Sequence, residues 1–130
     1  MDEMKKILVV DDDSDFLKIT EEILVGAGFL PVCVINTEDA LKKISEDKFD
    51  LIILDMMMNS ITEGFDFASR LKNDEKTAEI PIILVSSMTE SPHFPEKFHQ
   101  LFRKSWPVSA SLEKPFSAKV LINRINDFIK

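Results

Sequence analysis

Acidic, hydroxyl and ammonium side chains stand at the ends of the apolar segments of this chain. In chain order they are Asp11, Asp12, Asp13, Asp55, Ser86 and Lys114. Clustered carboxylates repel one another, and a bound divalent cation is one reason for a fold to hold them together. An ionised carboxylate beside such a cation can act as a nucleophile. A bare acidic triplet is more often a solvated loop, so the elements that carry these residues decide between the two interpretations.

Short apolar runs alternate with helical spacing of apolar residues along the chain. The pattern predicts strands at Lys6–Val10, Pro31–Ile35, Phe49–Asp55, Ile80–Ser86 and Val108–Glu113. It predicts helices at Ser14–Val25, Thr37–Glu46, Gly64–Lys72, Phe94–Lys104 and Ser117–Ile129. The runs ILVV, LIIL and IILV are continuously apolar, which suits strands buried on both faces. We expect an α/β fold with a doubly wound, five-stranded parallel sheet, flavodoxin-like strand order 2-1-3-4-5 and helices on both faces.

In such a sheet, ligands bind outside the carboxyl ends of the strands. The predicted strands end at or just before the acids, Ser86 and Lys114, so these side chains converge on one edge. Each residue alone is weak support, because an Asp or Ser at a strand end is usually a turn residue and a Lys before Pro is usually solvated. Their joint placement favours a functional site.

Four segments, ILVVDDD, IILDMMM, PIILVSS and EKPF, resemble the signature segments of the receiver domains of two-component response regulators. The resemblance covers essentially the whole chain. It implies that Asp55 is the phosphoacceptor. It also implies an Mg²⁺ site formed by Asp11, Asp12, Asp55 and the backbone carbonyl of Met57.

The same resemblance implies that Ser86 is the switch hydroxyl and that Lys114 is the lysine of the site. Phosphoryl transfer needs positioning and charge neutralisation more than covalent help. The metal, Lys114 and the Ser86 hydroxyl would each hold one phosphoryl oxygen, and movement of Ser86 would repack the neighbouring strand ends. The implied donor is a sensor histidine kinase or a phosphotransfer protein, and the implied reader is an unidentified downstream protein.

The segment between Ser86 and Lys114 departs from the family pattern. It is longer than usual, and Ser111 stands where the family often has an aromatic switch residue. We expect a remodelled output face, with Trp106 and Ser111 as candidate partner contacts. Met57 and Met88 follow the acceptor and the switch hydroxyl by two residues each. They either fill gaps or restrict in-line water and lengthen the phosphoryl lifetime.

Composition narrows the remaining functions. The chain has 130 residues, of which 45% are hydrophobic, and this suits one receiver domain over 1–130, alone or within a longer protein. The net charge is −7 and no basic stripe is visible, so direct nucleic-acid binding is not expected. No apolar run reaches about 18 residues, so we expect no membrane insertion and a cytoplasmic location. The single cysteine, Cys33, cannot form an internal disulfide.

Two alternatives remain open. A pseudo-receiver would bind partners without phosphorylation, although its usual mark, the loss of an acid or the lysine, is absent here. A phosphatase with an Asp nucleophile would want a second acid two residues later, where Met57 stands. We therefore expect that the chain is not an enzyme and catalyses only its own phosphoryl transfer and autodephosphorylation.

Overall fold

Five strands form one sheet in the computed structural model, which describes residues 4–55, 61–86, 109–114 and 116–129. The strands are β1 (Lys6–Val10), β2 (Leu30–Val34), β3 (Leu51–Asp55), β4 (Ile82–Ser86) and β5 (Ala110–Glu113). Every neighbouring pair is parallel, and the order is β2-β1-β3-β4-β5. The predicted doubly wound parallel sheet is therefore confirmed.

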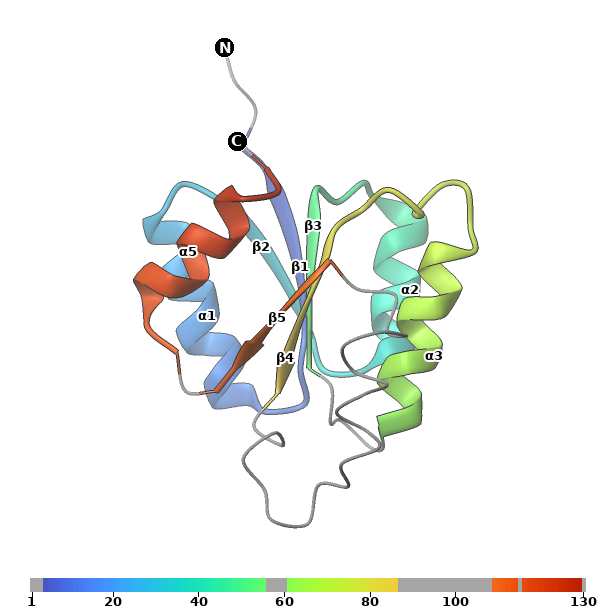
Figure 1. Cartoon of the computed structure of the whole chain (residues 1–130), viewed down its shortest axis with the longest axis horizontal. Helices are drawn as coiled ribbons and strands as arrows, with labels where there is room; N and C mark the ends of the chain where they lie inside the picture. The colour runs from blue at the N-terminus through green and yellow to red at the C-terminus, as the bar shows by residue number, and fades with distance from the viewer. Residues whose placement is uncertain (1–3, 56–60, 87–108, 115, 130) are drawn as a thin grey trace.

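Helices cover both faces of the sheet. In the described ranges they are α1 (Ser14–Gly26), α2 (Thr37–Glu46), α3 (Ile61–Lys72) and α5 (Ala118–Asn126). Figure 1 shows α1 and α5 on one face and α2 and α3 on the other. The helix predicted at Phe94–Lys104 lies outside the described residues.

The central strands are buried because each face of the sheet meets a helical layer. Along β1, Ile7 and Val9 join the core under α1 and α5, whereas Leu8 and Val10 join the core under α2 and α3. All four side chains are fully buried. A strand with two buried faces needs a continuous apolar run rather than alternation, as ILVV has.

Side-chain caps fix where α1 and α2 begin. The Asp13 carboxylate accepts hydrogen bonds from the backbone N–H groups of Asp15 (3.0 Å) and Phe16 (3.3 Å). The Asn36 side chain likewise accepts one from the Asp39 N–H at 2.7 Å. These bonds satisfy N–H groups that the first turn of a helix leaves unpaired. The cap places Asp13 at the junction between β1 and α1.

Several element boundaries differ from the predicted ones. Strand β3 begins at Leu51 rather than Phe49, and β4 begins at Ile82 rather than Ile80. Just before β3, the Asp50 carboxylate accepts a hydrogen bond from the Lys6 N–H (2.8 Å). Just before β4, Pro81 has no N–H to donate to a neighbouring strand. Strand β2 lies one residue earlier than predicted.

Helix α3 begins at Ile61, not at Gly64, because the helix continues through this glycine although glycine disfavours helix interiors.

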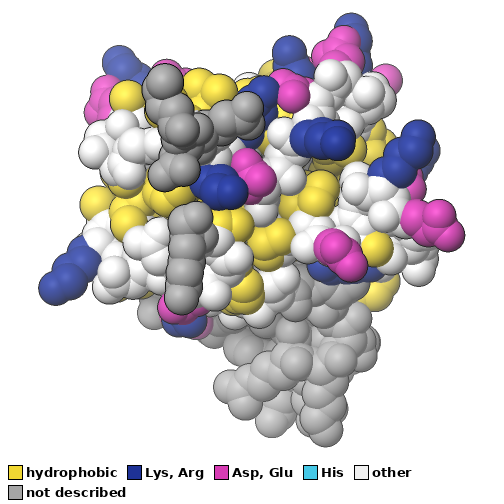
Figure 2. Space-filling model, turned by 90° about the horizontal axis from the view of Figure 1, so that it is seen from above, with side chains coloured by type: hydrophobic (Ala, Val, Ile, Leu, Met, Phe, Trp, Pro, Cys, Tyr) yellow, Lys and Arg dark blue, Asp and Glu magenta, His cyan; other side chains and the backbone are white. Residues whose placement is uncertain are grey.

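The described surface mixes charges. On the face seen in Figure 2, Lys and Arg side chains lie among Asp and Glu side chains and not in one basic patch. Among the described helices, none is long and apolar enough to cross a membrane.

Candidate functional site

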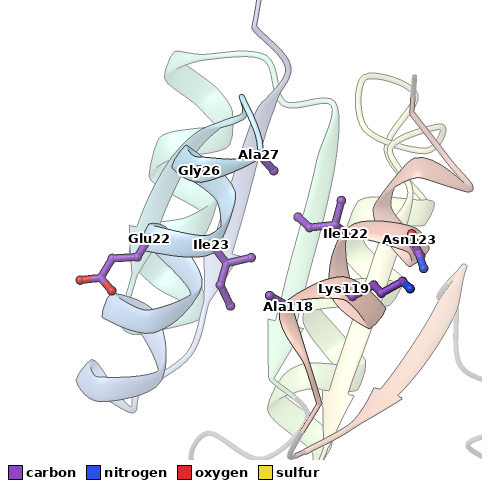
Figure 3. Close-up of a pocket in the computed structure, with 8 residues that line it drawn as sticks. All are labelled: Glu22, Ile23, Gly26, Ala27, Ala118, Lys119, Ile122 and Asn123. Carbon is purple, nitrogen blue, oxygen red and sulfur yellow. The ribbon is translucent and has the colours of Figure 1, made fainter.

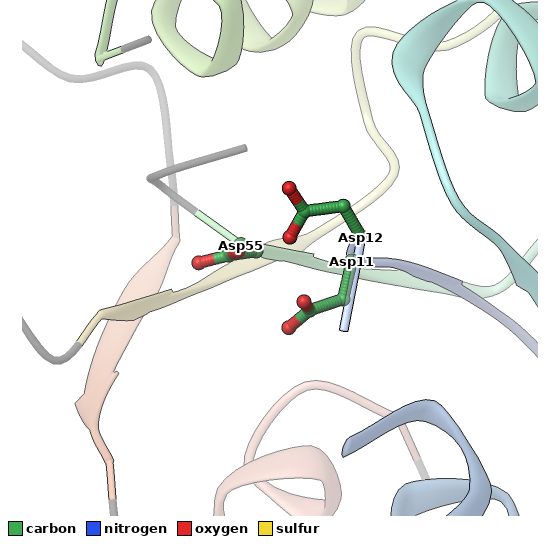
Figure 4. A group of neighbouring side chains, drawn as sticks. All are labelled: Asp11, Asp12 and Asp55. Carbon is green, nitrogen blue, oxygen red and sulfur yellow. The ribbon is translucent and has the colours of Figure 1, made fainter. Parts of the chain in front are cut away.

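Three carboxylates meet where β1 and β3 end. Val10 pairs with Leu54 in the parallel register, so the following residues, Asp11 and Asp55, come to the same edge on adjacent strands. One carboxylate oxygen from each of Asp11, Asp12 and Asp55 lies within 4.8 Å of the other two. Figure 4 shows the three side chains gathered at this edge. The structure thus brings together the three acids that the sequence assigned to one metal site.

Burial differs among the three acids. Asp11 is 1% exposed and Asp55 is 7% exposed, whereas Asp12 is exposed. Buried carboxylates are costly to ionise unless a cation or hydrogen bonds compensate them. The site therefore combines two buried acids with one that faces solvent, from which an ion could enter.

Asp11 is fixed by three contacts. Its backbone N–H donates to the Val34 carbonyl (3.1 Å), and its Oδ1 accepts from the Asp13 N–H (2.9 Å). Its Oδ2 accepts from Lys114 Nζ at 3.0 Å, which is also an ion pair. Because Asp13 also caps α1, the position of Asp11 is tied to the start of that helix.

Strand pairing brings Lys114 and Ser86 to the same edge. Ser86 pairs with Glu113 in the register of β4 and β5, and the next N–H, that of Lys114, donates to the Ser86 carbonyl at 2.8 Å. Ser86 is buried. The Lys114 side chain then reaches Asp11, 103 residues away in sequence. The predicted hydroxyl therefore ends β4, next to β3, and the predicted ammonium follows β5 at the same edge of the sheet.

Two phenylalanines that the sequence analysis did not assign to the site lie near Lys114. Phe16 contacts the lysine, and Phe116 contacts Phe16. Lys114 Nζ lies 4.0 Å from the centroid of the Phe16 ring, over its face. Phe116 packs edge-on against Phe16, with centroids 5.9 Å apart and planes at 87°. The signal was present in the sequence: Phe116 ends the EKPF segment, and Phe16 lies in the first turn after the acidic triplet.

The donor set fits a small hard cation. Three carboxylates offer oxygen only, and Mg²⁺ prefers oxygen ligands in an octahedron completed by waters. A divalent ion at this point would also offset the repulsion among the acids. The predicted fourth protein ligand, the carbonyl of Met57, lies outside the described residues.

Other predicted residues are not part of the acidic cluster as described. Met88 and Trp106 lie outside the described residues, so their predicted roles in phosphoryl lifetime and partner binding stay predictions. Ser111 lies on β5, is exposed, and pairs with Leu84. Its exposure on an edge strand is compatible with a partner contact.

A hollow between α1 and α5 contains none of the clustered acids (Figure 3). It is lined by Glu22, Ile23, Gly26, Ala27, Ala118, Lys119, Ile122 and Asn123.

Cys33 is a separate feature on β2. Burial, with Glu21 nearby, raises the pKa of its thiol to about 11, which keeps it protonated and unreactive at neutral pH.

The fold and the site match one family. The family model for the response regulator receiver domain matches residues 7–126, and the chain belongs to this family. The chain is 34% identical over 128 residues to the phosphate regulon transcriptional regulatory protein PhoB of Pseudomonas aeruginosa, covering 97% of this chain and 52% of that protein. It is 26% identical to the response regulator SaeR of Staphylococcus epidermidis, covering 97% of this chain and 51% of that protein.

Solved structures show the same fold. The chemotaxis response regulator CheY4 of Vibrio cholerae matches with a TM-score of 0.82 and 26% identity, covering 98% of this chain and 100% of that one. A putative response regulator from Chloroflexus aurantiacus matches with a TM-score of 0.84 and 23% identity, covering 97% and 98%. The chain spans about half the length of the curated relatives it matches. It is the receiver domain of a two-component response regulator.

Proposed function

We propose that this receiver domain is a phosphorylatable switch in which Asp55 accepts a phosphoryl group in the presence of Mg²⁺. One observation carries the proposal: the Asp55 carboxylate, at the end of β3, lies within 4.8 Å of the carboxylates of Asp11 and Asp12. A cation held by this group would bring the phosphoryl oxygens to the Asp55 nucleophile. The donor is a sensor histidine kinase or a phosphotransfer protein.

Each neighbouring residue has a defined task in this proposal. Asp11 and Asp12 hold the ion, and when bound the ion supplies neutralisation of charge on the phosphoryl oxygens. Lys114 stands beside the acids, bonded to Asp11 at 3.0 Å, and turns its ammonium to a phosphoryl oxygen once Asp55 carries the group. Ser86 donates its hydroxyl to another oxygen.

The response to phosphorylation then travels along β4 and β5. Because Lys114 and Ser86 are joined by a backbone hydrogen bond of 2.8 Å, a shift at either residue moves the carboxyl ends of both strands. The exposed Ser111 on β5 and Trp106 are the proposed contacts for a downstream protein. We propose no turnover of a separate substrate, and autodephosphorylation returns the switch to its resting state.

The test is the intact mass of the protein after incubation with acetyl phosphate, with and without Mg²⁺. The wild-type protein gains the mass of one phosphoryl group only with Mg²⁺. Asp55→Asn gains none, because the amide cannot accept the group. Asp127→Asn, which changes an exposed acid at the C-cap of α5, gains it as the wild type does.

The proposal would be refuted by a folded wild-type protein that gains no mass in Mg²⁺ and whose tryptophan fluorescence shows no Mg²⁺-dependent change with fluoroberyllate. The result would favour the pseudo-receiver alternative. Equal phosphorylation of Asp55→Asn and the wild type would move the acceptor to another residue.

A further inference from the structure

Two described residues of different chemistry lie next to the ammonium of Lys114. On one side is the Asp11 carboxylate, with its Oδ2 3.0 Å from Nζ. On another is the face of the Phe16 ring, 4.0 Å from Nζ to the centroid. A ring face attracts a cation through its quadrupole but accepts no conventional hydrogen bond, so it leaves the N–H donors of the ammonium available.

We propose that Phe16 is a positioning residue, whose ring face holds the Lys114 ammonium at the acidic site while that ammonium passes from Asp11 to the phosphoryl group. The inference rests on the function proposed above. The lysine must exchange one anionic partner for another, because the metal and Lys114 both need Asp11. The ring is the neighbour that stays attractive in both states.

The ring is itself held in place. Phe16 lies in the first turn of α1, where its N–H bonds to Asp13, and Asp13 in turn bonds to Asp11. Phe116, two residues after the lysine, packs edge-on against the same ring at a centroid distance of 5.9 Å. Both phenylalanines pack against the core under α1 and α5. Phe16 on α1 thus contacts the lysine directly, and Phe116 packs against the Phe16 ring.

A lysine side chain has four flexible bonds, and ordering it costs rotamer entropy. A ring face under the ammonium reduces the volume that the lysine explores and so reduces the entropy lost when it binds the phosphoryl group. The effect should appear in the rate of phosphorylation and only when the lysine is present. A purely structural Phe16 would change the rate equally with and without the lysine.

The experiment measures the rate of Asp55 phosphorylation by acetyl phosphate at saturating Mg²⁺ in a double-mutant cycle. Phe16→Leu removes the ring but keeps an apolar side chain, and we expect a rate roughly three- to tenfold lower. Phe16→Tyr keeps the ring face and stays within about twofold of the wild type. With Lys114→Met already present, Phe16→Leu changes the rate less than about twofold.

Phe29→Leu is the matched control, because Phe29 is also half-buried and packs against the same core. We expect it to leave the rate unchanged. An equal loss of rate in Phe16→Leu and Phe29→Leu would overturn the positioning role. So would an equal effect of Phe16→Leu with and without Lys114.

A second measurement does not need phosphorylation. Protons over a ring face are shifted upfield in the NMR spectrum, so the Lys114 ε-methylene protons should be upfield in the wild type and in Phe16→Tyr and should return to ordinary values in Phe16→Leu. The absence of an upfield shift in the wild type would overturn the inference alone. A shift that is present in a protein that gains no phosphoryl group would instead overturn the proposed function.

Discussion

Among the described residues, two lysine–aspartate ion pairs lie at opposite ends of the sheet. At the amino end, Lys6, the first residue of β1, pairs with Asp47, which caps the end of α2. At the carboxyl end, Lys114 pairs with Asp11, 3.0 Å away. The Asp47 side chain is 47% exposed and that of Asp11 is 1% exposed. The two lysine side chains are similarly exposed, at 25% and 22%, so the two pairs differ in the burial of their acids.

The difference favours the pair at the carboxyl end as the one that takes part in the proposed chemistry. Water screens an exposed pair, which therefore contributes little to stability. A buried carboxylate beside two others is costly to ionise unless cations or hydrogen bonds compensate it. Only the pair at the carboxyl end therefore lies where a metal ion and a phosphoryl group would change its partners.

The largest expected effect separates the two lysines. Lys114→Met should lower the rate of Asp55 phosphorylation by acetyl phosphate on the order of a hundredfold, because a positioned cation at the transferred group is lost. Lys6→Met should leave the rate unchanged. The time course of intact mass measures both. Similar rates in Lys114→Met and the wild type would remove the lysine from the proposed mechanism.

The second-largest expected effect is on Mg²⁺ affinity, which should differ between substitutions of Asp12 and of Asp47. Asp12→Asn should weaken Mg²⁺ binding roughly tenfold or more, because affinity follows the number of charged ligands. Asp47→Asn should bind Mg²⁺ as the wild type does. Calorimetric titration of each protein measures the dissociation constants. Unchanged affinity in Asp12→Asn would place the ion elsewhere.

Stability should change in opposite directions. Without metal, Asp12→Asn should raise the melting temperature by about 3–5 °C, because one of three repelling carboxylates is neutralised. Asp47→Asn should lower it slightly, since an attractive pair is lost. Saturating Mg²⁺ should reduce the gain in Asp12→Asn, because the ion stabilises the wild type more. A lower melting temperature for metal-free Asp12→Asn would show that repulsion is not the dominant interaction at this residue.

The smallest expected effect is on the pKa of Asp47, the acid of the exposed pair. The hydrogen bond from Lys6, followed by that from the Lys48 N–H, lowers the pKa of the Asp47 carboxyl below its ordinary 3.8. The pair's contribution to stability is therefore complete above pH 3.8 and is lost as pH falls through the lower, folded-state pKa. NMR titration of Asp47 should give a value below 3.8 that returns toward 3.8 in Lys6→Met. An identical pKa in both proteins would contradict this assignment.

Much of the fold follows from local pattern, whereas the wiring of the site does not. Continuous apolar runs predicted β1, β3 and β4 because strands buried on both faces require them, and the strand ends placed Asp11 and Asp55 at one edge. The start of α3 was missed because Gly64 is a poor helix former inside that helix. The pairing of Lys114 with Asp11 spans 103 residues and depends on side-chain directions that periodicity does not encode. The contact of Phe16 with Lys114 could not be predicted for the same reason.

The central claim is that Asp55 carries the phosphoryl group, and the most direct measurement identifies the modified residue. The protein is phosphorylated with acetyl phosphate and Mg²⁺, reduced with borohydride, which converts an acyl phosphate to an alcohol, and mapped by tandem mass spectrometry. The account predicts reduction at Asp55 and at no other carboxylate, and none when Mg²⁺ is omitted. Reduction at Asp11 or Asp12, with Asp55 intact, would contradict it.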